Sequence, residues 1–266
     1  MSCLSWNYRG LGNPLTVQDL HQLVQSKFPS FVFFMETKCR RNSIEKLKRQ
    51  LQFANSFVID CKGLSGGLAF LWSEDVEAKV LSYTQHHISL LIQGEVGSRE
   101  WVLTGFYGNP DTARERRALK ALKPALDKGW VCIGDFNEVL SLRDKSGGRL
   151  RPFNQIKAFR AAIEAYSLSN TGYIGNKFTW ANGRSGQAFI KERIDRAFCN
   201  IEWSEIFLYS KFYNLALSLD HCPILITMEQ FQVDSTRNDK PFRYEARWAL
   251  REDCYGGVEK AWNKPR

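Results

Sequence analysis

Five short polar clusters in this chain carry the residue types of a hydrolytic site, and each cluster follows or ends a short apolar run. Such runs are typical of buried strands, and α/β proteins build their sites from polar groups at strand ends. An imidazole, carboxylates and carboxamides together can hold a hard divalent cation and activate water against a phosphodiester. The clusters contain Asn7, Glu36, Asp135 with Asn137, Asp195, and Asp220 with His221.

The pair Asp135 and Asn137 comes directly after Gly134, where an apolar run stops. Side chains two residues apart in extended geometry face the same side, so both groups could address one phosphate. An Asx turn that caps the strand is the alternative interpretation.

Glu36 closes the continuous apolar run 31–35. A carboxylate at that position is costly unless it is solvated, paired or bound to a metal. The alternative to a metal is an ion pair with Lys38 or Arg40. Asn7 alone predicts only a turn, and a functional role is expected for it only because the other clusters are present.

Asp195 stands between two arginines and can form an ion pair with Arg193 or Arg196. The functional alternative is that Asp195 orients His221 and fixes the tautomer of its imidazole. Tyr107 ends an apolar run before a turn, where a phenol can donate to a phosphate oxygen or simply be a half-buried aromatic. The other histidines have no such context and are expected on the surface or on a sheet face: His21, His86 and His87.

The composition is that of a globular protein with a sizeable core, since 44% of its 266 residues are hydrophobic. The net charge of +9 favours a polyanionic partner such as nucleic acid or an anionic membrane surface, with ordinary solubility charge as the alternative. No apolar stretch is long enough to span a bilayer, and the N-terminus has no secretory signal. Seven scattered cysteines without a C-x-x-C pattern argue against a disulfide framework or zinc site and indicate a reducing compartment.

The elements that must position these clusters are mostly strands. Helices are expected over 15–28, 42–51, 111–126 and 153–166, the second opened by a capping box of Asn42 and Glu45. Strands are expected over 1–6, 31–35, 57–60, 67–72, 76–83, 87–93, 101–107, 130–133, 178–180, 189–198, 207–215 and 223–228. Helices fall between groups of strands, which predicts two packed sheets with helices outside.

Three regions are expected along the chain. Residues 1–229 form the folded domain, 230–242 are a polar linker, and 243–266 are a helical tail. The abrupt end of the tail predicts that it is the start of a truncated downstream region.

Taken in order, six motifs resemble the endonuclease/exonuclease/phosphatase superfamily, which includes DNase I-like nucleases. The motifs are SWNYRG (5–10), METK (35–38), GFYG (105–108), GDFNE (134–138), RIDR (193–196) and DHCP (220–223). The segments WNYRGLG (6–12), ETK (36–38), FTW (178–180) and PFRYEARW (241–248) are most similar to the endonuclease domain of plant LINE-type non-LTR retrotransposons. One departure is Leu219, where the superfamily usually has a serine before Asp-His.

The resemblance implies an α+β fold, a four-layer α/β/β/α sandwich with two packed mixed sheets flanked by helices. It also implies roles for single residues. Glu36, Asn7 and Asp220 would hold Mg²⁺, with Mn²⁺ as an alternative; Asp195 would orient a catalytic His221; Asp135 and Asn137 would align water and phosphate; Tyr107 would bind a phosphate oxygen.

The function that this resemblance implies is Mg²⁺-dependent nicking of double-stranded DNA to give a 3′-hydroxyl. In a retroelement, that hydroxyl would prime a reverse transcriptase domain in the nucleus. Basic runs at 38–41, 46–49, 114–123 and 143–151 could contact phosphates, or be solvated helix faces. DNA contacts are expected from Arg9, Lys38, Arg149 and Trp180, although Trp180 could equally be a core aromatic. The alternatives are a phosphatase acting on phosphoinositides or other phosphoesters, and a catalytically decayed DNA-binding relic, which the loss of the serine at Leu219 would favour.

Overall fold

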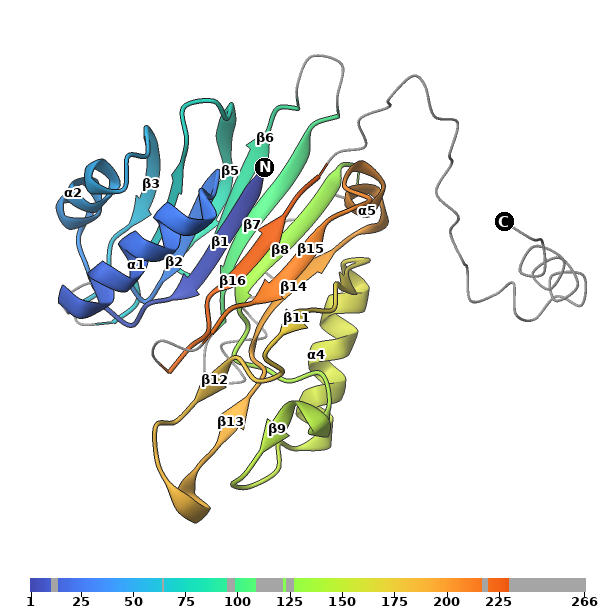
Figure 1. Cartoon of the computed structure of the whole chain (residues 1–266). Coiled ribbons are helices and arrows are strands. Elements are labelled where there is room, and N and C mark those ends of the chain that lie inside the picture. The colour runs from blue at the N-terminus through green and yellow to red at the C-terminus, as the bar shows by residue number, and fades with distance from the viewer. Residues whose placement is uncertain are drawn as a thin grey trace, which may run out of the picture. The chain divides into compact units, whose positions relative to one another are not determined.

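Two large mixed β-sheets form the centre of the protein (Figure 1). The structure is a computed structural model that describes residues 1–10, 14–63, 65–94, 99–108, 122, 127–216 and 220–229. These residues belong to one unit, Met1–Phe231. None of the helices in this part of the chain combines the length and the apolar character needed to cross a lipid bilayer.

The seven-stranded sheet has the order β11-β15-β16-β1-β2-β4-β3. Strand β1 (Ser2–Asn7) runs parallel to β2 (Phe31–Met35) and antiparallel to β16 (Ile224–Thr227). The N-terminal strand is therefore placed between an early and a late segment of the chain. The other strands are β3 (Asn55–Ile59), β4 (Leu68–Trp72), β11 (Ile174–Gly175) and β15 (Lys211–Asn214).

The six-stranded sheet has the order β10-β14-β8-β7-β6-β5. Strand β8 (Gly129–Asp135) runs parallel to β7 (Trp101–Tyr107) and antiparallel to β14 (Asp195–Cys199). The outer strands are β5 (Ala78–Thr84), β6 (His87–Ile92) and β10 (Ser169–Asn170).

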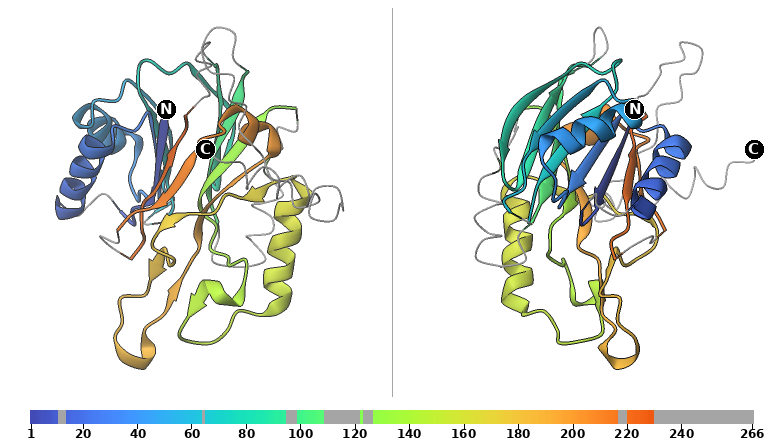
Figure 2. Two further views of the ribbon diagram at one scale, coloured as in Figure 1. Left: turned by 45° about the vertical axis from the view of Figure 1, so that its right-hand side comes forward. Right: turned by 90° about the vertical axis from the view of Figure 1, so that its left-hand side faces the viewer.

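Helices cover the outer faces of both sheets, which explains why the central strands are apolar without alternation. In β2, alternate residues starting at Phe31 point into the core between the sheets, whereas Val32 and Phe34 pack under α1 (Pro14–Lys27) and α2 (Arg41–Gln50). Helix α4 (Phe153–Ala165) covers the outer face of the six-stranded sheet, the face that points away from the core between the sheets. Figure 2 shows this order of layers, and the predicted four-layer α/β/β/α sandwich is confirmed.

A small third sheet of β9 (Lys145–Ser146), β12 (Trp180–Ala181) and β13 (Lys191–Glu192) lies below the two large sheets in Figure 1. The buried Glu192 carboxylate ties it together by pairing with Lys145 and, at 2.6 Å, with Arg151. Between Glu192 and Asp195 the chain passes directly from this sheet into the six-stranded one. Two 3-10 turns, Leu142–Asp144 and Gly186–Ala188, and a short helix α5 (Ile201–Ile206) complete the described elements.

Several sequence-based boundaries were wrong. Strand β8 continues through Gly134 to Asp135, and the run 189–198 is broken into β13 and β14. Helix α2 has no capping box from Asn42 and Glu45, because it begins at Arg41 and the Arg41 N–H donates to Asp60 Oδ1 at 2.7 Å. Helix α5 was not predicted. The expected helix 111–126, apart from Leu122, and the linker and tail beyond residue 229 lie outside the described residues.

Candidate active site

Strand register brings the predicted catalytic side chains to one end of the two sheets. Asp135, the last residue of β8, pairs with Tyr107 in β7 on one side and with Asp195 in β14 on the other. In the facing sheet, Asn7 ends β1 beside the end of β2. The Asn7 amide donates to Asp135 Oδ2 at 2.9 Å, so the ends of the two sheets are linked through the site itself.

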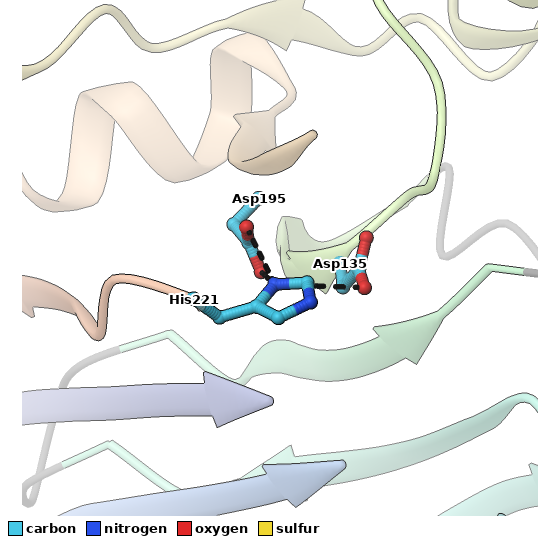
Figure 3. A group of neighbouring side chains, drawn as sticks. All are labelled: Asp135, Asp195 and His221. Carbon is cyan, nitrogen blue, oxygen red and sulfur yellow. Dashed lines mark hydrogen bonds and ion pairs between the residues drawn. The ribbon is translucent and has the colours of Figure 1, made fainter. Parts of the chain in front are cut away.

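His221 lies against two buried carboxylates (Figure 3). Its Nδ1 is 3.1 Å from both carboxylate oxygens of Asp195 and 3.9 Å from Asp135 Oδ2. The predicted contact between Asp195 and His221 is therefore present. Because Nδ1–H donates to Asp195, Nε2 is the ring nitrogen left to address a substrate.

Backbone contacts hold this dyad in place from both sides. The Thr179 hydroxyl accepts hydrogen bonds from the Ile194 and Asp195 N–H groups at 3.1 and 3.0 Å. The Trp6 indole N–H donates to the His221 carbonyl at 3.1 Å. Histidine and carboxylate are thus fixed by groups from two separate segments of the chain.

Burial and charge act in opposite directions on the pKa of His221. Burial alone would lower it, but the negative charge and hydrogen bonds of Asp195, with the charges of Asp135 and Asp220, raise the pKa to about 9. For Asp135, burial and then the charge of Asp195 raise the pKa to about 7, against smaller opposing effects from His221, Asn7 and the Asn137 N–H. At neutral pH the imidazole is thus cationic, while Asp135 can exchange a proton.

The segment around Asp135 is shaped by its backbone. Gly134 has φ of 150°, and a side chain there would collide with the Phe106 carbonyl. Asn137 has φ of 52°, so the two residues are not in the extended geometry expected from their spacing. Instead, the Asn137 N–H donates to Asp135 Oδ1 at 2.8 Å, which is the alternative Asx turn, and the Asn137 amide donates to the Gly108 carbonyl at 2.8 Å.

Glu36 lies at the entrance of the site, where its side chain is 16% exposed. Its Oε1 accepts from the Tyr107 hydroxyl at 2.6 Å and from the Asn7 amide at 3.3 Å. Burial, together with the charge and hydrogen bond of Glu36, raises the pKa of Tyr107, so the phenol stays protonated. The Lys38 ammonium lies 3.9 Å from Glu36 Oε2, so the alternative ion pair is also present.

Asp220 forms an ion pair with Arg9. The Arg9 Nη1 lies 2.6 Å from Asp220 Oδ2, and the Arg9 Nε is 4.0 Å from Glu36 Oε2. Arg9, Glu36 and Lys38 all have left-handed backbone conformations, with φ of 43°, 49° and 51°. Non-glycine residues rarely adopt this conformation, and it tends to gather at functional sites.

Two neighbouring groups of side chains are candidates for a divalent cation. Asp135, Asp195 and His221 place one ligand atom each within 4.8 Å of one another, but all three are fully buried and are engaged with each other or with Asn7. The group of Glu36, Asn7 and Asp220 offers only oxygen ligands, and its carboxylates are 16% and 25% exposed. Hard cations such as Mg²⁺ prefer accessible oxygen ligands, so the second group fits such an ion better.

A protein-family model described as the Endonuclease/Exonuclease/phosphatase family matches residues 4–210. The chain belongs to this family. Its members are nucleases and phosphatases, hydrolases that act on phosphate esters, and the segment matched contains every candidate site residue except Asp220 and His221.

Solved structures of this family share the fold at low sequence identity. The endonuclease domain of TRAS1, a telomere-specific non-LTR retrotransposon, is 12% identical, with a TM-score of 0.63 over 86% of this chain and 98% of that chain. The 3′ phosphatase NExo from Neisseria, bound to a product DNA hairpin, is 14% identical, with a TM-score of 0.62 over 86% and 99%. An AP endonuclease from Archaeoglobus fulgidus is 13% identical, with a TM-score of 0.63 over 86% and 99%.

The remaining residues that the sequence pointed to lie in different parts of the fold. Arg196 pairs with Asp144 at 2.8 Å, so the proposed ion pair of Asp195 with that arginine is replaced by the contact with His221. Trp180 is half-buried, packs beside a small apolar cluster and has its ring 6.5 Å from that of His221; its DNA contact stays a prediction. Arg149 is exposed in the loop before α4 and its DNA contact stays a prediction. Leu219 lies outside the described residues.

Two residues beside the site were missed. Thr179, which supports Asp195, lies in the FTW motif but was not singled out. His86 was expected on a surface or sheet face, yet its Nδ1 is 3.2 Å from the Tyr107 carbonyl and its own carbonyl accepts from the Tyr107 N–H at 2.7 Å. The pairing of β6 with β7 would have revealed this contact, because His86 directly precedes β6.

Proposed function

We propose that the protein is a divalent-metal-dependent endonuclease that hydrolyses phosphodiester bonds of double-stranded DNA and leaves a 3′-hydroxyl. The observation that carries this proposal is the buried dyad of Asp195 and His221 next to Asp135, beside the oxygen group around Glu36. These parts can supply a cation, a proton acceptor and metal ligands to one phosphate.

The roles of the side chains follow from their protonation. Asp135, with its raised pKa, accepts the proton of the attacking water. The cationic His221 offers Nε2–H to the phosphate oxygen on which negative charge develops, and Asp195 keeps the ring in that orientation. The bond from phosphorus to the 3′ oxygen breaks, and that oxygen takes up a proton from solvent, which gives a 5′-phosphate and a 3′-hydroxyl. Tyr107 holds the Glu36 carboxylate and faces the same phosphate.

A bound Mg²⁺ or Mn²⁺ would supply charge stabilisation at the phosphate. Glu36 would hold it, with Asn7 and Asp220 contributing further oxygen ligands. Proteins of this family typically use divalent metals, and the accessible oxygen donors around Glu36 suit such an ion.

DNA is the substrate class that the surface charge and the structural neighbours support. The net charge is +9, and Arg9 and Lys38 lie at the entrance with side chains 46% and 38% exposed. Neighbours with this fold include a retrotransposon endonuclease domain and an enzyme bound to a DNA hairpin. We infer a retrotransposon-type role, in which the nick would prime a reverse transcriptase domain and the protein would work in the nucleus.

The test is nicking of supercoiled plasmid by wild type, Glu36→Ala and His221→Ala, in Mg²⁺ and in EDTA. Glu164→Ala and His21→Ala are matched controls outside the site; Glu164 is on the exposed face of α4. We expect nicking only in Mg²⁺, loss in both site variants and retention in both controls. Extension of the nick by a DNA polymerase would show the 3′-hydroxyl.

Two other outcomes would assign the alternatives. Release of inorganic phosphate from inositol phosphates or from 3′-phosphorylated DNA, without nicking, would indicate a phosphatase. A folded wild type that binds duplex DNA but hydrolyses none of these substrates would be a decayed relic, and the catalytic proposal would be wrong.

A further inference from the structure

Arg9 contacts all three of the candidate metal ligands. Its guanidinium pairs with Asp220 at 2.6 Å and approaches Glu36 Oε2 at 4.0 Å. Its backbone N–H lies 3.4 Å from Asn7 Oδ1, the carboxamide oxygen that would face a cation. One basic residue therefore engages each oxygen group to which the proposed function assigns the metal.

The position of Arg9 is set by the backbone and not by burial. Arg9 has φ of 43° and the following Gly10 has φ of 108°, so the chain turns sharply after β1 and directs the side chain across the site. The Arg9 side chain is nevertheless 46% exposed. Its ion pairs are made by the guanidinium at the end of this half-exposed side chain, so it can leave the carboxylates without disturbing the core.

We propose that Arg9 is an internal counter-cation of the metal site, which a divalent ion must displace from Asp220 and Glu36, and that the displaced guanidinium then binds a DNA phosphate. This inference rests on the proposed function, because it uses the same ligands. A guanidinium and a divalent cation compete for the same carboxylate oxygens, so each lowers the affinity of the other. The released guanidinium is a bidentate donor suited to phosphate. Metal binding and DNA binding are thereby coupled through one side chain.

Lys38 provides the matched comparison. Its ammonium also faces Glu36 Oε2, at 3.9 Å, but within the described part of the chain it forms no ion pair with Asp220. Lys38 and Arg9 carry the same charge and have similar exposure, 38% and 46%. If positive charge lowers the metal affinity only at long range, neutralising either residue should raise that affinity equally. Direct competition for Asp220 predicts a larger rise when Arg9 is neutralised.

The experiment is titration of Mn²⁺ without DNA, followed by isothermal calorimetry and by the electron paramagnetic resonance signal of free Mn²⁺. Wild type is compared with Arg9→Gln, Arg9→Ala, Arg9→Lys and Lys38→Gln, each checked by circular dichroism for folding. Arg9→Gln and Arg9→Ala both remove the ion pairs of Arg9 with Asp220 and Glu36, so Mn²⁺ no longer has to break them. Because an exposed ion pair contributes up to about 1 kcal/mol, Mn²⁺ binding is expected to tighten about fivefold in both variants. Lys38→Gln should change the affinity less, and Arg9→Lys should stay near wild type. Unchanged or weaker binding in both neutral Arg9 variants would overturn the proposal, because Arg9 would then support the ligands rather than compete for them.

Duplex DNA binding, measured by fluorescence anisotropy in EDTA and in Ca²⁺, tests the release of Arg9. The affinity gained on adding Ca²⁺ should be larger in wild type than in Arg9→Gln. An equal gain in the two proteins would overturn the release step. A wild type that shows both metal effects but never nicks DNA would count against the proposed function and leave this coupling standing.

Discussion

Raising the pH from 7 to 9 is expected to destabilise the protein by about 2 kcal/mol through His221 alone. Burial would lower the pKa of this histidine, but Asp195 and the other nearby carboxylates outweigh burial and raise the pKa from 6.5 to about 9. Each unit of pKa difference between the folded and unfolded states corresponds to about 1.4 kcal/mol, so the full contribution is about 3 kcal/mol. The folded protein binds more protons in this range. The stabilisation is therefore complete below pH 6.5 and is lost as the pH rises through about 9.

Urea unfolding at constant ionic strength, from pH 5.5 to 9.5 in reducing buffer, measures this contribution for wild type and His221→Gln. The difference between the two free-energy curves isolates the histidine, because buried thiols such as Cys132, whose pKa is raised by burial, affect both proteins equally. Asp135, whose pKa is raised from 3.8 to about 7, makes stability fall as the pH rises towards 7 and adds little further change above it, so the slope in the alkaline range reports His221. Asp195→Asn should flatten the alkaline slope by removing the charge that keeps the imidazole protonated.

His87 provides a control of opposite sign. It is buried between the Ser82 and Thr84 hydroxyls, and burial, helped by the charge of His86, lowers its pKa to about 4. The unfolded state then binds the extra proton, so stability should rise between pH 4 and 6.5, and His87→Gln should remove that acid limb alone. If His221→Gln has the same alkaline slope as wild type, the imidazole is not held as a cation and the assigned catalytic role of His221 is wrong.

Three further substitutions test the supports of the site. Gly134→Ala should cost more than about 3 kcal/mol in urea unfolding, since it combines strained backbone with a direct collision; a cost below about 1 kcal/mol would contradict this. Thr179→Val removes the acceptor of two buried N–H groups beside Asp195 and should cost about 1–3 kcal/mol while slowing nicking; unchanged stability would refute the support. Tyr107→Phe frees Glu36 from its 2.6 Å hydrogen bond and should lower the nicking rate about tenfold with the melting temperature kept; an unchanged rate would exclude a role for the hydroxyl.

The sheets could be predicted because their strands are continuous apolar runs. The run 31–35 is buried on both faces, and its position as β2 matches the sequence prediction residue for residue. The same holds for β7 at 101–107. Strand ends were less predictable. The run 189–198 looks continuous in sequence, yet it joins two different sheets, and no local pattern marks the change.

The site was predictable as a set of residue types, and its internal pairing was not. A polar residue after a buried run is visible in sequence, so Asp135, Asp195 and His221 could be selected together. Strand pairing decides which of them touch, and that depends on contacts far apart in the chain. Arg9 and Asp220 illustrate the limit: nothing near either residue indicates that they meet at 2.6 Å.

The backbone conformations at the entrance were also beyond sequence reasoning. Glu36, Lys38 and Asn137 adopt left-handed φ values that glycine would adopt at lower cost. Spacing arguments that assume extended strands fail there, as the pair Asp135 and Asn137 shows. The side chains reach the site because the chain turns out of the strand at that point.

Buried carboxylates lie close together where a phosphate would bind. Asp135 and Asp195 face each other across paired strands, in a buried environment that disfavours two negative charges. Protonated His221 relieves that conflict at one side, and Arg9 does so for Glu36 and Asp220 at the other. Each cation is thus held by carboxylates until a competing charge arrives. A divalent metal would release Arg9, and a phosphate would draw on both cations, so the ion pairs that stabilise the resting site are the same contacts that substrate and metal would exchange.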